Sequence, residues 1–297
     1  MFQKYAGAPI FGDKTTGTLF DVYLTNLPDG RLRMDLSTRR NGSLSVSFSE
    51  DGVNWSAPVT TLPPEPASGW EEIVNRNCVV KVGDTYRMWY TGQAHGNSYI
   101  GFAESEDGVR FRRVSDRPVL SPEAPFEGES VMNPCVLFEN GLYRMWYSAG
   151  ETYEPNVLCY AESEDGIRWR KSPLNPVLEK NPAKAYEQNR IGGCQMLRHR
   201  SLGYLLFYIG YRDINTACIC AACSEDGVTN FRRCLLNPIV QPTPGAWDAD
   251  SCYKPSALFD ENRGVWRVWY NGRRGSEEYV GLAEKPGDFT AADFEPQ

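Results

Sequence analysis

Histidine is nearly absent from this chain of 297 residues, which contains only His95 and His199. Histidine-based metal centres and Ser-His-Asp catalysis are therefore poor expectations. The sequence also has no Gly-rich phosphate loop leading into a helix, so nothing indicates a nucleotide cofactor. We expect a functional site that works without a metal ion and without a cofactor.

An excess of positive charge is missing as well, because 31 Lys and Arg residues stand against 38 Asp and Glu, for a formal net charge of −7. Nucleic acids and anionic membranes are bound through basic surfaces, so neither is an expected partner. No apolar stretch is long enough to cross a bilayer, and the first seven residues lack the apolar core of a secretion signal. We expect a cytoplasmic protein that acts on a small, soluble, polar molecule; the oligomeric state stays open.

The nine cysteines are an odd number and lie mostly in apolar, alternating segments such as residues 218–223. In such segments Cys behaves as a small hydrophobic side chain. We therefore expect reduced, packed thiols rather than disulfides or a zinc site.

The most informative pattern is a repeat. Ser-Glu-Asp-Gly occurs four times, from Ser49, Ser105, Ser163 and Ser224, at intervals of 56, 58 and 61 residues. The Asp-Gly pair supplies the positive φ of a tight turn, and the Ser hydroxyl can bond nearby backbone. We interpret this motif as a structural hairpin.

A second repeat lies upstream and occurs five times, at residues 33–36, 87–90, 144–147, 205–208 and 267–270, with Arg-Met-Trp-Tyr as its fullest form. Each copy follows a turn signal and an apolar strand. One unit therefore reads as four antiparallel strands, and five units predict an all-β, five-bladed β-propeller in a single domain over residues 1–297. The expected blades are about 19–57, 70–116, 126–174, 186–236 and 246–291.

The ring is expected to close through the N-terminus. Residues 2–5 repeat the outer-strand phrase of residues 111–114, so we predict that they form the outer strand of the fifth blade. Phe289, near the C-terminus, is the competing candidate.

Functional residues are expected where the first strand of each blade starts and the second ends, because these ends meet at one mouth of the ring. Alignment of the repeats places four residues at equivalent first-strand positions: Arg76, Asn133, Gly192 and Lys254. Asp21 joins them if the first hairpin is one residue longer, as residues 26–30 suggest. Four residues earlier lies a second set: Glu72, Glu129, Gln188 with Glu187, and Asp250. The ends of the second strands add Arg39, Arg40, Gln93, His95, Glu151, Tyr153, Glu154, Asp213 and Arg273. The alternative is that individual charges form ion pairs at blade junctions.

The Trp-Tyr strands, the Ser-x-Asp-Gly-x-x-Trp hairpins and the acidic strand starts resemble the five-bladed propeller glycoside hydrolases of families 43, 32, 68 and 130. Segments 150–156 and 247–255 resemble a predicted-glycosidase branch of that superfamily. The resemblance implies a family 43 base at Asp21. It also implies a second aspartate, in the third blade, at the position where this chain has Asn133, which leaves Glu129 or Glu151 as substitutes. Finally, it implies a catalytic acid in the fourth blade, where Glu187 is available but the residues around it do not match the family pattern.

Glycoside hydrolysis requires two carboxyls, one that donates a proton and one that is ionised. The candidate catalytic residues are Asp21, Glu129, Glu151 and Asp250, with acid and base unassigned. The candidate substrate-binding residues are Arg39, Arg40, Glu72, Arg76, Gln93, Asn133, Tyr153, Asp213, Asp248, Lys254 and Arg273.

Two other functions stay open. Phosphorolysis, as in family 130, would use the cations of the mouth to hold phosphate, since guanidinium groups bind phosphate bidentately. A non-catalytic propeller that binds carbohydrate would show carboxylates that are far apart or each paired with an arginine.

Overall fold

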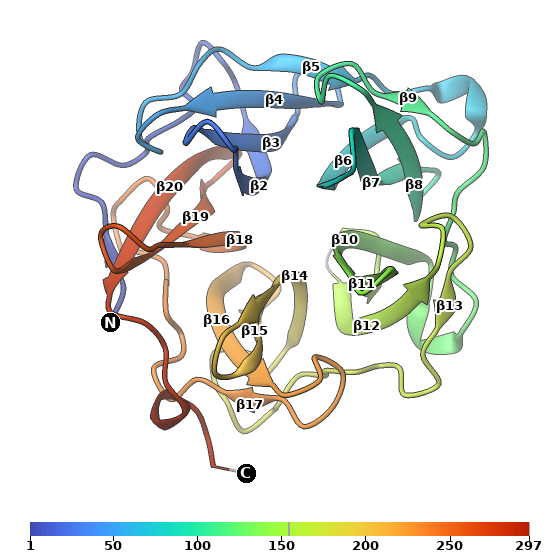
Figure 1. Ribbon diagram of the computed structural model, residues 1–297. Helices are drawn as coiled ribbons and strands as arrows, with labels where there is room; N and C mark the ends of the chain where they lie inside the picture. The colour runs from blue at the N-terminus through green and yellow to red at the C-terminus, as the bar shows by residue number, and fades with distance from the viewer. Residues whose placement is uncertain (154, 297) are drawn as a thin grey trace.

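Each of the five repeats forms an antiparallel sheet of four strands in the computed structural model, which describes residues 1–153 and 155–296. The sheets surround a central axis with their first strands innermost (Figure 1). The predicted all-β, five-bladed propeller is therefore confirmed. Blades two and three are joined at their inner ends by one parallel pairing, Ser98 with Ser130.

The first blade consists of β2 (Leu19–Asn26), β3 (Leu32–Thr38), β4 (Ser43–Ser49) and β5 (Val59–Leu62). The second consists of β6 (Ile73–Val82), β7 (Thr85–Ala94), β8 (Asn97–Ser105) and β9 (Arg112–Arg113). The third consists of β10 (Ser130–Glu139), β11 (Leu142–Gly150), β12 (Pro155–Ser163) and β13 (Arg170–Lys171). The outer strand of the first blade thus lies beyond the expected boundary at residue 57.

The fourth blade consists of β14 (Arg190–His199), β15 (Gly203–Asp213), β16 (Thr216–Ser224) and β17 (Arg232–Arg233). The fifth consists of β18 (Ser251–Asp260), β19 (Val265–Arg274), β20 (Glu277–Pro286) and β1 (Gln3–Lys4). Three short 3₁₀ helices lie in the connections: η1 (Pro66–Ser68), η2 (Pro125–Glu127) and η3 (Ala291–Asp293). Among the described residues, none of the helices has the length and apolar character that a bilayer span requires.

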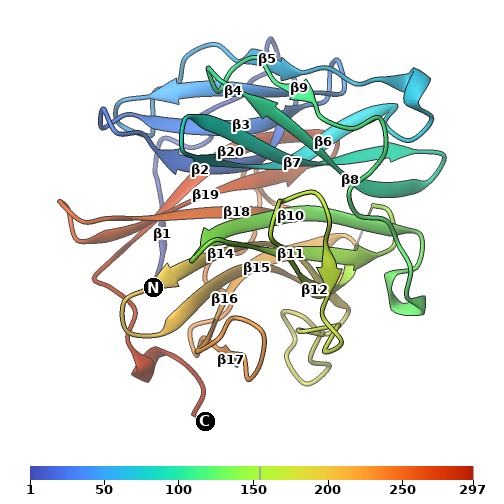
Figure 2. The same ribbon diagram turned by 45° about the vertical axis from the view of Figure 1, so that its right-hand side comes forward.

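The N-terminal strand closes the ring, as predicted. β1 pairs with β20 through Gln3–Glu284 and Lys4–Ala283. Phe289, the competing candidate, instead packs in the core against Phe2. The C-terminal segment runs on to the outer edge of blade four, where it lies beside β17 (Figure 2).

Tryptophans of the second strands clamp neighbouring blades together. The indole N–H groups of Trp89, Trp146 and Trp269 donate to the glycine carbonyls of the Ser-Glu-Asp-Gly turns at residues 166, 227 and 52, over 2.8, 2.6 and 2.9 Å. Each turn belongs to the next blade of the ring. Blade four carries Phe207 at this position, and the blade that follows it lacks the motif. The Ser-Glu-Asp-Gly turn therefore forms a hydrogen-bonded contact between neighbouring blades.

Trp146→Phe tests this clamp. The change leaves the carbonyl of Gly227 buried without its donor, so we expect a loss of about 1–3 kcal/mol in the free energy of unfolding. Trp55→Phe is the control, because the buried Trp55 indole N–H has no hydrogen-bond partner within the described residues. Urea unfolding of both variants measures the difference, and equal losses would contradict the clamp.

Four blades also share a buried ion pair between the loop that enters the blade and its outer strand. We call these pairs the blade staples. They are Glu71–Arg113, Glu127–Lys171, Glu187–Arg233 and Asp248–Lys4, with N–O distances of 2.6, 2.8, 2.5 and 2.5 Å. Tyrosine hydroxyls donate to three of these carboxylates, from Tyr147, Tyr208 and Tyr270. These acids are at most 1% exposed, and among them the Asp248 Oδ1 atom has no hydrogen-bond partner within the described residues.

Candidate functional site

The first strand of every blade is interrupted by a β-bulge close to the central axis. The pairing with the second strand shifts register after Phe20, Asn75, Met132, Gly192 and Tyr253. The residue that follows each of these has a positive φ: Asp21 (55°), Arg76 (53°), Asn133 (54°), Gly193 (42°) and Lys254 (48°). The fourth-blade equivalent is thus Gly193 rather than the Gly192 expected from the alignment.

Positive φ is costly for residues with a side chain, at about 1–3 kcal/mol each, and such strain clusters at functional sites. Bulges also re-aim side chains next to active sites. The five-fold recurrence of this conformation at one ring is therefore a structural reason to look for function there.

The backbone amides at these ring positions are held from the neighbouring blade. Four of them donate to side-chain oxygens near the ends of second strands in the preceding blade, over 2.8 to 3.1 Å: Asp21 to Asn271, Arg76 to Ser37, Asn133 to Thr91 and Gly193 to Ser148. Packing between blades thus keeps the side chains of the ring pointed at the axis.

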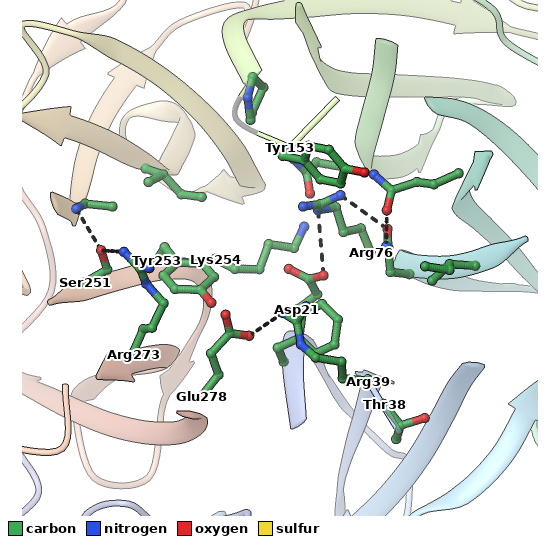
Figure 3. Close-up of a pocket in the computed structure, with 18 of the residues that line it drawn as sticks. Asp21, Thr38, Arg39, Arg76, Tyr153, Ser251, Tyr253, Lys254, Arg273 and Glu278 are labelled. Atoms are coloured by element: carbon green, nitrogen blue, oxygen red, sulfur yellow. Dashed lines mark hydrogen bonds and ion pairs between the residues drawn. The ribbon is translucent and has the colours of Figure 1, made fainter. Parts of the chain in front are cut away.

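These side chains form the floor of a cavity of about 260 Å³, which we call the funnel (Figure 3). Of the described residues that line it, four are cationic and two are carboxylic: Arg39, Arg76, Lys254 and Arg273, with Asp21 and Glu278. Polar lining also comes from Gln93 and Asn133, and Tyr153 stands at the rim with 72% of its surface exposed.

Asp21 is the central carboxyl of the funnel and is 2% exposed. Its Oδ2 atom has no hydrogen-bond partner within the described residues, and the Arg76 Nε lies 3.7 Å away, which is too long for a hydrogen bond. Burial raises the pKa of Asp21 above 3.8, against the opposing effect of Arg76 and Lys254. The site thus favours the protonated carboxyl more than water does, and such a group can donate a proton.

Lys254 approaches Asp21 from blade five, with its amine directed towards Asp21 and Arg76 (Figure 3). It is 3% exposed, and burial lowers its pKa although the Asp21 carboxylate opposes the shift. Two cations and one carboxyl therefore meet at the funnel floor, an arrangement that suits a bound anion.

Glu278, at the start of β20, is a funnel carboxyl that the sequence analysis missed. The guanidinium Nη2 of Arg39 lies 3.0 Å from its Oε2. The repeats align residues of the first and second strands, whereas Glu278 lies on the third strand of its blade. Alternation could have found it, because Glu278 is in phase with the buried Val280 and Leu282.

The structure brings one part of the predicted set together at the funnel: Asp21, Arg39, Arg76, Gln93, Asn133, Tyr153, Lys254 and Arg273. Their roles stay predictions. Glu154 lies outside the described residues.

The remaining candidates lie elsewhere, which corrects their predicted placement. Asp248 is a blade staple. Glu72 and Glu129 are exposed in the loops that enter their blades, next to the staple acids Glu71 and Glu127.

Three further candidates form exposed ion pairs or lie in a shallow surface depression. Glu151 pairs with Arg190 at 3.1 Å, and Asp213 pairs with Arg212 at 3.3 Å at the end of β15. Arg40 lies beside Lys14 in a depression outside the funnel.

Asp250 lies in a separate groove, where its Oδ2 accepts the amide of Gly275 over 2.7 Å. The candidates four residues before the ring positions do not line the funnel. They lie in connecting loops, where the two-residue alternation of a strand no longer predicts which side chain points inward.

This chain is similar, in part or over most of its length, to several known proteins. Residues 43–181 match the model of the glycosyl hydrolases family 32 N-terminal domain. An uncharacterized protein of Mycobacterium tuberculosis (strain ATCC 25618 / H37Rv) is 28% identical over 296 residues, which cover 95% of this chain and 92% of that protein. A 1,2-beta-oligomannan phosphorylase of Thermoanaerobacter sp. (strain X514) is 28% identical over 155 residues, 51% of this chain and 46% of the phosphorylase.

Solved structures show the same fold. A thermostable family-43 glycoside hydrolase superposes with a TM-score of 0.75 at 17% identity, over 98% of this chain and 97% of the other. The beta-1,2-mannobiose phosphorylase from Listeria innocua, solved with beta-1,2-mannobiose, superposes with a TM-score of 0.70 at 14% identity, over 96% of each chain.

Proposed function

We propose that this chain is a glycoside phosphorylase of the superfamily of five-bladed β-propeller glycoside hydrolases and phosphorylases, to which parts of its sequence and its fold are similar. The observation that carries the proposal is the composition of the funnel. Four cations surround two carboxyls, and one of these, Glu278, is already paired with Arg39. Hydrolysis requires two working carboxyls, whereas phosphorolysis requires one acid and an anion site.

In this reaction the protonated Asp21 donates its proton to the glycosidic oxygen, and an oxygen of hydrogen phosphate attacks the anomeric carbon. The bond between that carbon and the glycosidic oxygen breaks as the bond to phosphate forms. The products are a sugar 1-phosphate and a glycan shortened by one unit, and the proton of hydrogen phosphate replaces the one that Asp21 gave up.

Arg76 and Lys254 are the cations that best suit the phosphate, because they flank Asp21 at the floor. Arg39 is engaged by Glu278, and Arg273 donates to the carbonyl oxygen of Asn215 and to the Ser251 hydroxyl. Guanidinium offers a bidentate contact to phosphate, and the ammonium adds a point charge.

The first test is product formation. The protein is incubated with β-1,2-linked manno-oligosaccharides, chosen because two partial relatives are named as phosphorylases of such sugars, and with a panel of aryl glycosides. Each incubation is run with and without inorganic phosphate. We expect sugar 1-phosphate in the presence of phosphate and little turnover in its absence. Hydrolysis at a rate that phosphate does not change would sink the proposal.

Lys254→Met is expected to raise the KM for phosphate by about 10–100-fold, since hydrogen bonds to charged groups contribute roughly 1.5–3 kcal/mol. The KM for the glycan should change much less. Lys14→Met is the matched control, because the Lys14 side chain is 84% exposed and lies outside the funnel. Equal phosphate KM values in the two variants would remove Lys254 from the phosphate site.

Hydrolysis is the second candidate, and one observation favours it. Glu278 lies close enough to Asp21 to raise the pKa of that carboxyl, and the Arg39 guanidinium lies 3.0 Å from the Glu278 carboxylate. Asp21 would then act as the acid and Glu278 as the base. Under this alternative Glu278→Gln lowers hydrolysis by about 10²-fold or more, whereas a phosphorylase tolerates the change better.

A further inference from the structure

A groove opens beside the funnel between blades four and five. It is lined by residues of three segments, 212–216, 241–250 and 273–275, and has a volume of about 600 Å³. We call it the blade 4–5 groove. Its lining is mostly polar and includes Thr216, Gln241 and Asp250.

The groove and the funnel share one residue, Arg273, which lines both. The wall between them is held in place by a small network: Arg273 donates to the carbonyl oxygen of Asn215 over 2.7 Å, and the Ser251 hydroxyl donates to the same oxygen over 2.8 Å. Ile214 lies on the funnel side of this turn, and Asn215 on the groove side. These hydrogen bonds therefore hold Arg273 in a fixed position between the funnel and the groove.

The funnel by itself is small. At about 260 Å³ it falls below the roughly 300–1,000 Å³ typical of small-molecule sites. Exposed apolar side chains form parts of its rim on other blades, with Ile73 at 46% and Tyr153 at 72% exposure. An oligosaccharide that extends out of the funnel over Arg273 would meet hydrogen-bonding groups. At Ile73 and Tyr153 it would meet apolar side chains instead.

We propose that the blade 4–5 groove binds the sugar units of the substrate that remain outside the funnel, so that the protein prefers oligosaccharides longer than a disaccharide. This inference rests on the proposed function of the funnel. The Asp250 carboxylate and the Gln241 amide accept and donate hydrogen bonds to sugar hydroxyls, and Pro242 and Pro244 offer flat apolar faces to sugar rings.

A competing exit exists on blade one, where Arg39 lines both the funnel and a shallow depression that contains Lys14 and Arg40. This depression is smaller, at about 420 Å³, and its charged lining is cationic. It supplies the matched control for the test.

The experiment compares kcat/KM for β-1,2-mannobiose and β-1,2-mannotetraose in the presence of phosphate. The wild-type protein should prefer the tetrasaccharide by about tenfold, the effect of roughly 1.4 kcal/mol of extra binding. The double variant Gln241→Ala/Asp250→Ala and the groove-filling variant Ala249→Trp should bring this ratio close to one. The control Lys14→Ala/Arg40→Ala should keep the wild-type ratio.

A wild-type ratio near one, or a ratio lost only in the Lys14→Ala/Arg40→Ala control, overturns the inference. If neither sugar is turned over, the proposed function fails separately. Calorimetric titration with mannotetraose then tests the groove. Binding about tenfold weaker in both groove variants than in the control supports the inference, and equal or undetectable binding overturns it.

Discussion

Asp21→Asn is expected to lower turnover by about 10²–10⁴-fold, the range for loss of a general acid, while the folded protein becomes more stable at pH 7. Asparagine cannot donate the proton that the leaving oxygen needs. It also remains neutral, so it avoids the cost of a buried carboxylate. In addition, Asn tolerates the positive φ of this position at least as well as Asp.

The stability effect depends on pH with a definite sign. The pKa of Asp21 is raised in the folded protein, so the folded state holds this proton at pH values where the unfolded chain has lost it. The stabilisation from that proton is complete below about pH 3.8, the ordinary value, and is lost as the pH rises through the folded pKa. The advantage of Asp21→Asn should therefore grow as the pH rises from 4 to 7.

Thermal unfolding at several pH values measures this difference, with Asp84→Asn as control, since Asp84 is exposed in the hairpin between β6 and β7. Two results would contradict the assignment: activity close to wild type, or a variant less stable than wild type at pH 7 and not at pH 4.

Glu187→Ala is expected to destabilise the protein by about 3–5 kcal/mol, because it removes a fully buried carboxylate and leaves the Arg233 guanidinium, 13% exposed, without that partner. The Tyr208 hydroxyl loses its acceptor as well. Turnover per folded molecule should stay near the wild-type value, since the staple does not line the funnel.

Glu151→Ala is the matched control. Its carboxylate is also paired with an arginine, Arg190, but 56% of the side chain is exposed, so the loss should be at most about 1 kcal/mol. Urea unfolding and turnover are measured on both variants. A stable Glu187→Ala protein that has lost its activity would show that Glu187 works in catalysis, as the family 43 resemblance implied.

The blades could be predicted from the sequence because their signals are local and repeated. Asp-Gly turns and Trp-Tyr strands recur at a near-constant period, and each copy checks the others. The same period aligned Asp21, Arg76, Asn133 and Lys254 before any geometry was known, and all four line the funnel.

The acids could not be placed in this way. Glu71 is buried and the adjacent Glu72 is exposed, and the two differ only in how an irregular loop turns at the blade entrance. Glu278 was missed because its strand carries no repeat of the charge in other blades. Distinguishing a staple from a site required knowing which cation each carboxylate reaches through space.

The charge state of Asp21 can be measured directly. The proposed chemistry requires that this carboxyl, held on the ring of positive-φ residues among cations that can bind an anion, stays protonated to a higher pH than in water. A carbon-detected NMR titration of ¹³C-labelled aspartate, with the Asp21→Asn spectrum to assign the signal, follows this group without any substrate. We expect a midpoint above 3.8. A midpoint at or below 3.8 would rule out Asp21 as the proton donor.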